Sequence, residues 1–203
     1  MVSKNWHYKN DMISHKMSLE LVLGPMFAGK SSAILQIVNR HKSIGRSTLL
    51  ISHSIDSRYS SENYIVNHDG SRIQCYKTNI LSLMNKEIVD AKLVIIEEAQ
   101  FFNDLYAFVL DLVEKHGKDV IVVGLDGDAD RKPFGQILDL VPLCDKITKL
   151  KAFCKLCADG TEALFTFCKK KKDEQVCVGG EDLYMPLCRR HYLTESITDI
   201  SSQ

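Results

Sequence analysis

The feature that most constrains this chain is the segment Gly24–Ser31, which reads Gly-Pro-Met-Phe-Ala-Gly-Lys-Ser. It matches the spacing G-x-x-x-x-G-K-[ST] and lies between an apolar run at 19–23 and a helical pattern at 31–41. In such loops backbone N–H groups surround phosphate oxygens, the lysine contacts the β- and γ-phosphates, and the last hydroxyl reaches Mg²⁺. The segment therefore predicts a nucleoside triphosphate site between a strand and a helix.

Short apolar runs alternate with stretches of helical spacing along the first 150 residues. The strand-like runs are 19–23, 48–52, 93–96 and 120–125, and the main helical stretches are 31–41 and 102–115. Unbroken apolar runs suit strands that are covered on both faces, and the alternation favours βαβ units. We therefore expect an α/β fold of the P-loop NTPase type, with a mainly parallel sheet flanked by helices.

Two acidic residues, Glu97 and Glu98, directly follow the third apolar run. Adjacent strand residues point to opposite faces, so one carboxylate can hold a hydrated metal ion while the other faces a nucleophile. Phe101 and Phe102 follow closely. Aromatic rings beside the carboxylates favour a flat organic acceptor over water, although a role of either ring in the core is an equal alternative.

Four potential metal ligands form two short pairs near the C-terminus, Cys154 with Cys157 and Cys188 with His191. C-x-x-C and C-x-x-H pairs that bracket a hairpin are typical of a tetrahedral Cys₃His zinc site. Such a site leaves no position open for water, so we expect structural Zn²⁺. The remaining cysteines have no partner spacing and are interpreted as thiols: Cys75, Cys144, Cys168 and Cys177.

Composition and hydrophobic pattern divide the chain into four parts. Residues 1–17 form a polar arm, 18–150 the α/β domain, 151–193 the zinc module and 194–203 a polar tail expected to be flexible. Within the module we expect a hairpin of the β-rich stretches 163–167 and 175–178, with a lysine-rich tip at 169–172.

Charge and hydropathy exclude several classes of protein. The chain has 26 basic and 26 acidic side chains, so no overall positive field attracts nucleic acid or an anionic membrane. No apolar run approaches the roughly 20 residues of a membrane span, and the start does not follow the order of a secretory signal. Together with an odd cysteine count, this predicts a cytoplasmic protein.

Four motifs occur together in the same order as in one known family. They are the phosphate loop, Glu-Glu-Ala-Gln-Phe-Phe at 97–102, Gly-Leu-Asp-Gly at 124–127 with Arg-Lys-Pro-Phe-Gly at 131–135, and the zinc pairs. From about 18 to 193 the chain resembles the type II thymidine kinases. The resemblance implies a P-loop domain followed by a zinc-ribbon-like β domain with a lasso loop, usually in a homotetramer. It also implies transfer of the γ-phosphate of ATP to the 5′-hydroxyl of thymidine, and of deoxyuridine, with Mg²⁺ and feedback inhibition by thymidine triphosphate.

The resemblance also assigns roles to residues. It implies that Glu98 is the general base, with Arg58 and Lys30 acting on the transferred phosphoryl group. The expected nucleotide and Mg²⁺ residues are Gly24, Met26, Ala28, Gly29, Lys30, Ser31, Ser32, Asp56 and Glu97. The expected thymidine residues are Met26, Phe101, Leu125, Phe134, Thr166, Val178, Gly179 and Tyr184. Gly179 belongs to the lasso loop, where the backbone is expected to approach the base closely.

This sequence departs from the family pattern at three places. Glu97 replaces the usual aspartate, Phe167 and Cys168 replace a basic pair, and Ala129 replaces an aromatic found in some members. Two other functions stay open on residue patterns alone. One is a nucleic-acid-binding P-loop ATPase with a structural zinc module, and the other is a zinc-stabilised nucleotide sensor without transfer chemistry.

Overall fold

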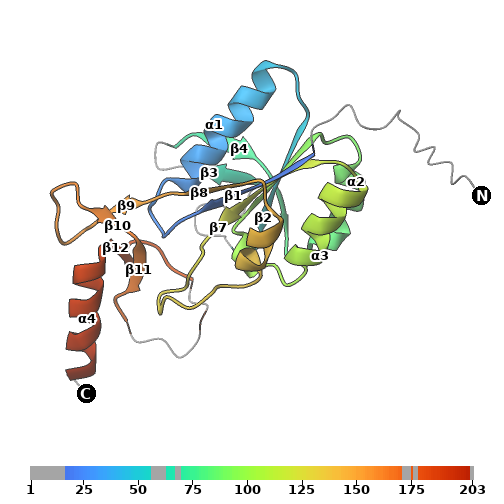
Figure 1. Ribbon diagram of the computed structural model, residues 1–203. Coiled ribbons are helices and arrows are strands. Elements are labelled where there is room, and N and C mark those ends of the chain that lie inside the picture. Colours follow the sequence, from blue (N-terminus) through green and yellow to red (C-terminus); the bar gives the residue numbers. More distant parts are fainter. Residues whose placement is uncertain (1–16, 56–62, 67–69, 171–174, 176–177, 202–203) are drawn as a thin grey trace, which may run out of the picture.

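A parallel sheet forms the centre of the α/β part of the molecule (Figure 1). It has six strands in the order β5-β2-β6-β7-β1-β8. The computed structural model describes residues 17–55, 63–66, 70–170, 175 and 178–201. The strands of the sheet are β1 (Ser18–Leu23), β2 (Thr48–His53), β5 (Tyr76–Thr78), β6 (Leu93–Glu97), β7 (Asp119–Gly124) and β8 (Lys146–Lys149). The predicted α/β fold with a mainly parallel sheet is confirmed.

Helices cover both faces of this sheet, with α1 on one side and α2 and α3 on the other (Figure 1). The helical segments are α1 (Lys30–Ser43), η1 (Leu81–Met84), α2 (Asn85–Ile88), η2 (Ala99–Phe101), α3 (Leu105–Leu110), the π-helical η3 (Asp111–Lys115) and η4 (Ile137–Leu143). A small antiparallel ribbon of β3 (Tyr64–Val66) and β4 (Arg72–Gln74) lies outside the sheet.

The apolar run of β6 shows why the strands read as continuous hydrophobic segments. Val94 and Ile96 pack into the buried cluster that includes α2 and α3, whereas Leu93 and Ile95 pack into the cluster that includes α1. Successive side chains of a strand point to opposite faces. A strand that is buried on both faces therefore has apolar residues at successive positions, without the alternation of apolar and polar residues seen in half-exposed strands.

The strand register brings the ends of β1, β7 and β6 to one edge of the sheet. Leu23 at the end of β1 pairs with Gly124 of β7, and Ile96 of β6 pairs with Val122 of the same strand. The loops that follow β1, β6 and β7 therefore leave from neighbouring points. Ligands of open parallel sheets bind at this carboxyl edge.

The C-terminal module contains two short antiparallel pairs, β9 (Ala152–Phe153) with β10 (Glu162–Ala163), and β11 (Phe165–Cys168) with β12 (Tyr184–Leu187). The predicted hairpin of 163–167 with 175–178 is therefore wrong, because Ala163 pairs with Ala152 and β11 pairs with 184–187. In this region Val178 lies outside any strand, and residues 176–177 are outside the described ones. The strand at 184–187 contains Pro186, a residue that weakens a strand signal, and its pairing is set by contacts across 16 or more residues.

Helix α4 (Arg189–Ser201) includes most of the segment that we expected to be a flexible tail. Two hydroxyl groups in it bond to carbonyl oxygens one turn earlier: Thr194 Oγ1 donates to Arg190 O at 3.1 Å, and Ser196 Oγ donates to Tyr192 O at 2.7 Å. These bonds satisfy polar side chains inside a helix whose composition resembles a loop. Among the described residues, none of the helices has the length and apolar character required to cross a membrane.

Candidate active site and metal cluster

The phosphate loop joins the end of β1 to the start of α1, as the motif requires. Gly29 is the residue before the helix and has a left-handed backbone (φ 79°). Lys30 Nζ donates to Gly24 O at 3.2 Å and to Pro25 O at 2.8 Å, so its ammonium group lies over the loop that precedes it. The loop thus has the strand, lysine and helix in the arrangement expected for binding phosphate.

The Ser31 hydroxyl links this loop to β6 across the intervening strand β7. Ser31 Oγ donates to Glu97 Oε1 over 3.1 Å, and Glu97 is 5% exposed. A hydroxyl and a carboxylate are hard oxygen ligands of the kind that Mg²⁺ prefers. The two residues predicted to hold the ion are therefore adjacent in space.

Glu98, the predicted base, lies just beyond the end of β6 with a left-handed backbone (φ 51°, ψ 41°). Its Oε2 accepts a hydrogen bond of 2.6 Å from Gln100 Nε2. The carboxylate of Glu97 faces Ser31 instead. The two neighbouring acids thus have different hydrogen-bond partners.

The two phenylalanines after the acids differ in their surroundings. Phe102 is 1% exposed and packs in the core, so the core alternative is right for this ring. Phe101 is only partly buried, and its ring meets the edge of Phe134 with centroids 5.4 Å apart. The structure therefore brings together two of the predicted thymidine residues.

Thr166 of β11 contacts the phosphate loop directly. Met26 N donates to Thr166 Oγ1 over 2.9 Å, and Thr166 is 5% exposed. This hydrogen bond joins residues 140 positions apart and ties the C-terminal module to the loop that precedes Lys30. The position was expected in the thymidine site, but its observed contact is with the loop backbone.

We expect Thr166→Val to lower the free energy of unfolding by about 1–3 kcal/mol, because it leaves the Met26 N–H without its acceptor. We also expect Kd for a nucleoside triphosphate to rise about 10-fold, which corresponds to about 1.4 kcal/mol of binding free energy, since the phosphate loop loses its tether. Denaturant unfolding and equilibrium nucleotide binding measure the two effects. Thr166→Ser is the matched control, because it keeps the hydroxyl; equal values for both variants would contradict the tethering role.

The remaining predicted residues of the thymidine site form two groups. Tyr184 packs in a small buried cluster beside Ala129, Cys168 and Leu183, and Met26 packs against this cluster. Val178 is 53% exposed, and its neighbour Gly179 lies so close to Leu183 that a Cβ would be 2.8 Å from that side chain. Asp56 and Arg58 are outside the described residues.

The departures from the family pattern are buried here. Phe167 packs with Tyr192 in the core of the C-terminal module, with ring centroids 5.8 Å apart. Cys168 and Ala129 share the small cluster that contains Tyr184. Apolar packing therefore occupies positions at which a basic pair or an aromatic is usual.

Three contacts in this region were not predicted from the sequence. His53, at the end of β2, packs against Phe101 and Phe102 with ring centroids 5.6 and 4.7 Å away, and its Nδ1 accepts a hydrogen bond from Ile55 N. Burial lowers the pKa of His53, and the nearby charge of Glu98 opposes this shift. No sequence signal marks a single histidine that ends a strand.

The second unpredicted contact is the hydrogen bond of 2.6 Å from the buried Tyr192 hydroxyl to Ala129 O, which joins α4 to the loop after β7. The guanidinium of Arg131 lies 4.5 Å from the Tyr192 ring centroid. The third unpredicted contact involves Asp128, whose carboxylate accepts hydrogen bonds from Lys132 N at 2.9 Å and from Gln175 Nε2 at 2.7 Å. The C-terminal module is thus held against the carboxyl edge by specific polar contacts.

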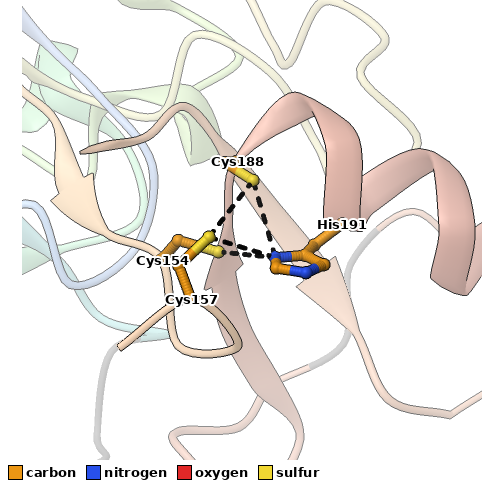
Figure 2. Close-up of side chains that lie close together, drawn as sticks. All are labelled: Cys154, Cys157, Cys188 and His191. Atoms are coloured by element: carbon orange, nitrogen blue, oxygen red, sulfur yellow. Dashed lines mark hydrogen bonds between the residues drawn. The ribbon is translucent and has the colours of Figure 1, made fainter. Parts of the chain in front are cut away.

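The four predicted metal ligands converge in the C-terminal module (Figure 2). Cys154 and Cys157 follow β9, Cys188 follows β12, and His191 lies in the first turn of α4. His191 Nδ1 is 3.3 Å from both Cys154 Sγ and Cys157 Sγ and 3.6 Å from Cys188 Sγ, and the Sγ atoms of Cys157 and Cys188 are 3.9 Å apart.

These distances fit a tetrahedral zinc ion. Zn–S bonds of about 2.3 Å and Zn–N bonds of about 2.0 Å place sulfur atoms about 3.8 Å apart and a sulfur and a nitrogen about 3.5 Å apart. Burial by itself raises the pKa of Cys154, but hydrogen bonds from the backbone around Cys188 and from His191 outweigh it and lower the pKa to about 6. The cluster is compatible with Zn²⁺, because a thiolate is the form of cysteine that binds metal.

Together the fold and site define an α/β protein with a phosphate-loop motif at the carboxyl edge of its sheet and a Cys₃His cluster beside it. Comparison with known sequences gives the family. The model of the thymidine kinase family matches residues 17–192.

Three relatives agree with this match. "Thymidine kinase a" of Arabidopsis thaliana is 40% identical over 89% of this chain and 76% of the relative, and the thymidine kinase of Oryza sativa subsp. japonica is 42% identical over 91% and 69%. The thymidine kinase of Choristoneura fumiferana entomopoxvirus is 40% identical over 87% and 96%. The chain belongs to the thymidine kinase family, which confirms the resemblance inferred from its motifs.

Proposed function

We propose that this chain transfers the γ-phosphate of ATP to the 5′-hydroxyl of thymidine. Its membership of the thymidine kinase family makes it an ATP-using kinase of thymidine. The structural observation that carries the proposal further is the hydrogen bond between Ser31 Oγ and Glu97 Oε1. It fixes the phosphate loop to the end of β6, one residue before the acid that we assign as the base.

In this assignment the loop 24–32 binds the phosphates of ATP, and Lys30 moves from the carbonyl oxygens of Gly24 and Pro25 to the phosphate oxygens. Ser31 and Glu97 would hold Mg²⁺, which when bound neutralises charge on the phosphates. We assign Asp56 and Arg58 to the same region on the family resemblance, together with Ala28, Gly29 and Ser32.

On the acceptor side, Glu98 removes the proton of the 5′-hydroxyl as that oxygen forms its bond to the γ-phosphorus. The bond from this phosphorus to the bridging oxygen breaks, and ADP leaves with the electron pair. Phe101 and Phe134, which already meet edge to face, supply an aromatic surface for the base. Met26, Leu125, Thr166, Val178, Gly179 and Tyr184 complete the proposed thymidine residues.

A panel of nucleosides incubated with ATP and Mg²⁺ tests this function. We expect formation of thymidine monophosphate and of deoxyuridine monophosphate, and no product from purine deoxynucleosides, because a site shaped for a pyrimidine excludes the larger base. Lys30→Ala serves as the background control. Product formation no higher than in this control would contradict the assignment.

The family match does not favour the alternative of a nucleic-acid-binding ATPase. That alternative requires ATP hydrolysis that DNA stimulates and thymidine leaves unchanged, with DNA binding that weakens steeply with salt. The same nucleoside panel, run with and without DNA, separates the two functions.

We also propose a division of the chain at about residue 150, a homotetrameric assembly and a cytoplasmic location. The division is supported by the buried clusters: two lie wholly before residue 151, and every buried member of a third comes from 152–192. A fourth, smaller cluster joins the two parts through Ala129 and Tyr184. The assembly and the location rest on the family resemblance and on composition. The same resemblance suggests feedback inhibition by thymidine triphosphate. Analytical ultracentrifugation measures the assembly directly.

A further inference from the structure

The conformation of Glu98 raises the question of what holds its carboxylate in place. Its φ of 51° lies in the left-handed region of backbone conformations, which residues other than glycine, asparagine and aspartate seldom adopt. Such a backbone persists only where the surroundings hold it, and it occurs often at functional sites. The residue also lies outside the strand proper, so the sheet hydrogen bonds of β6 do not orient it.

Gln100 contacts this carboxylate from the protein interior. It is 3% exposed, and its side-chain amide bridges two groups: Oε1 accepts from Leu125 N over 3.0 Å, and Nε2 donates to Glu98 Oε2 over 2.6 Å. A backbone N–H can only donate, so the oxygen of the amide must face Leu125. The nitrogen is then directed at Glu98, and the orientation of the amide follows from chemistry.

Two glycines allow the backbone to approach Gln100 closely. A Cβ on Gly135 would lie 2.1 Å from Gln100 O, and a Cβ on Gly124 would lie 2.4 Å from Gln100 Oε1. Real Cβ atoms do not approach other heavy atoms so closely. The backbone and the side chain of Gln100 therefore pack tightly against the end of β7 and the loop that follows it.

We propose that Gln100 is a positioning residue that holds the carboxylate of Glu98 in the direction of the acceptor hydroxyl. This inference rests on the proposed role of Glu98 as the base. The bridge connects Glu98 to the backbone at Leu125, a proposed thymidine residue, so the base and the nucleoside site share one rigid support. Gln100 exchanges no proton, because its amide only donates a hydrogen bond to Oε2.

Gln100→Glu provides the sharpest test, since it changes one end of the bridge only. One carboxylate oxygen still accepts from Leu125 N, but the other replaces the donor and repels Glu98. We expect kcat to fall about 10²-fold, which is the scale of a misplaced catalytic group, while KM for thymidine and Kd for ATP change less than about 3-fold. Gln100→Met removes both hydrogen bonds at similar volume, and we expect the same loss of kcat.

Gln136→Glu is the matched control. Gln136 Oε1 also accepts a backbone hydrogen bond, from Tyr106 N over 2.9 Å at the start of α3, and the residue lies outside the proposed site. We expect its kcat to equal that of the unmodified chain. ATP binding and thermal unfolding of each variant show whether it folds, and Gln100→Glu keeps the bond to Leu125 in case Gln100→Met is unstable.

Glu98→Gln in the same assay separates the two hypotheses. If Glu98→Gln retains normal turnover, the proposed function of Glu98 fails. If Glu98→Gln is inactive but Gln100→Glu has normal kcat, or raises KM alone, the positioning role is overturned. We further expect that Gln100→Met combined with Glu98→Gln is no slower than Glu98→Gln alone, because the two residues act as one unit.

Discussion

Glu98→Gln should lower kcat for thymidine phosphorylation about 10²- to 10⁴-fold, the contribution typical of a general base. The amide has the shape of the carboxylate but cannot take up the proton of the 5′-hydroxyl. ATP binding should be unchanged, because the phosphate loop contacts Glu97 through Ser31 and not Glu98. Radiolabelled phosphate transfer measures the first quantity, and equilibrium binding of an ATP analogue measures the second.

The control for this variant is Glu114→Gln, the same chemical change at an exposed position of η3. It should leave both quantities unaltered. Unchanged turnover in Glu98→Gln would exclude Glu98 as the base. Glu97 could not replace it without losing the hydrogen bond that joins the phosphate loop to β6.

Loss of the metal cluster should have an effect of similar size on activity through a different route. We expect Cys154→Ser to abolish zinc binding and to reduce thymidine phosphorylation more than about 100-fold. In small zinc modules the free energy of zinc binding, about 10–16 kcal/mol, is what stabilises the folded state. The module packs against Phe27 and Ala28 of the phosphate loop and holds Met26 through Thr166. When the module loses its structure, the loop loses these contacts.

Elemental analysis should find one zinc ion per chain, and limited proteolysis should cut the variant within residues 151–193 before it cuts the sheet. Cys144→Ser is the matched control. Its sulfur donates to Val141 O and lies outside the cluster, so zinc content and turnover should stay the same. Full activity of zinc-free protein would contradict the coupling between the module and the loop.

Short-range signals in the sequence predicted several features well. The phosphate loop, the strand-length apolar runs and the paired ligands Cys154 with Cys157 and Cys188 with His191 each depend on spacing within a few residues. Burial on both faces makes β6 an unbroken apolar run, and the spacing within each pair places its two side chains close together. Local geometry is sufficient for these features, whereas the fold of the C-terminal module brings the two pairs into one cluster.

Features that depend on pairing across long sequence distances were predicted less well. The partner of β11 was misassigned because Val178 lies in a stretch with a β-rich composition, whereas Tyr184–Leu187 contains a proline. The helix that includes 194–201 was not predicted for a local reason, because the polar composition of this segment resembles a loop. Propensity is a weak signal when tertiary contacts satisfy the polar groups.

The sequence by itself determined the class of fold, the strand–loop–helix context of the phosphate-loop motif, the four residues of the Cys₃His cluster and the resemblance to the thymidine kinases, because each depends on residue types at fixed short spacing. Only the tertiary structure decided which groups meet across the carboxyl edge: Ser31 with Glu97, Thr166 with Met26, and Gln100 between Glu98 and Leu125. Two of these contacts join residues more than 60 positions apart, so the parallel register of the sheet and the docking of the C-terminal module create them.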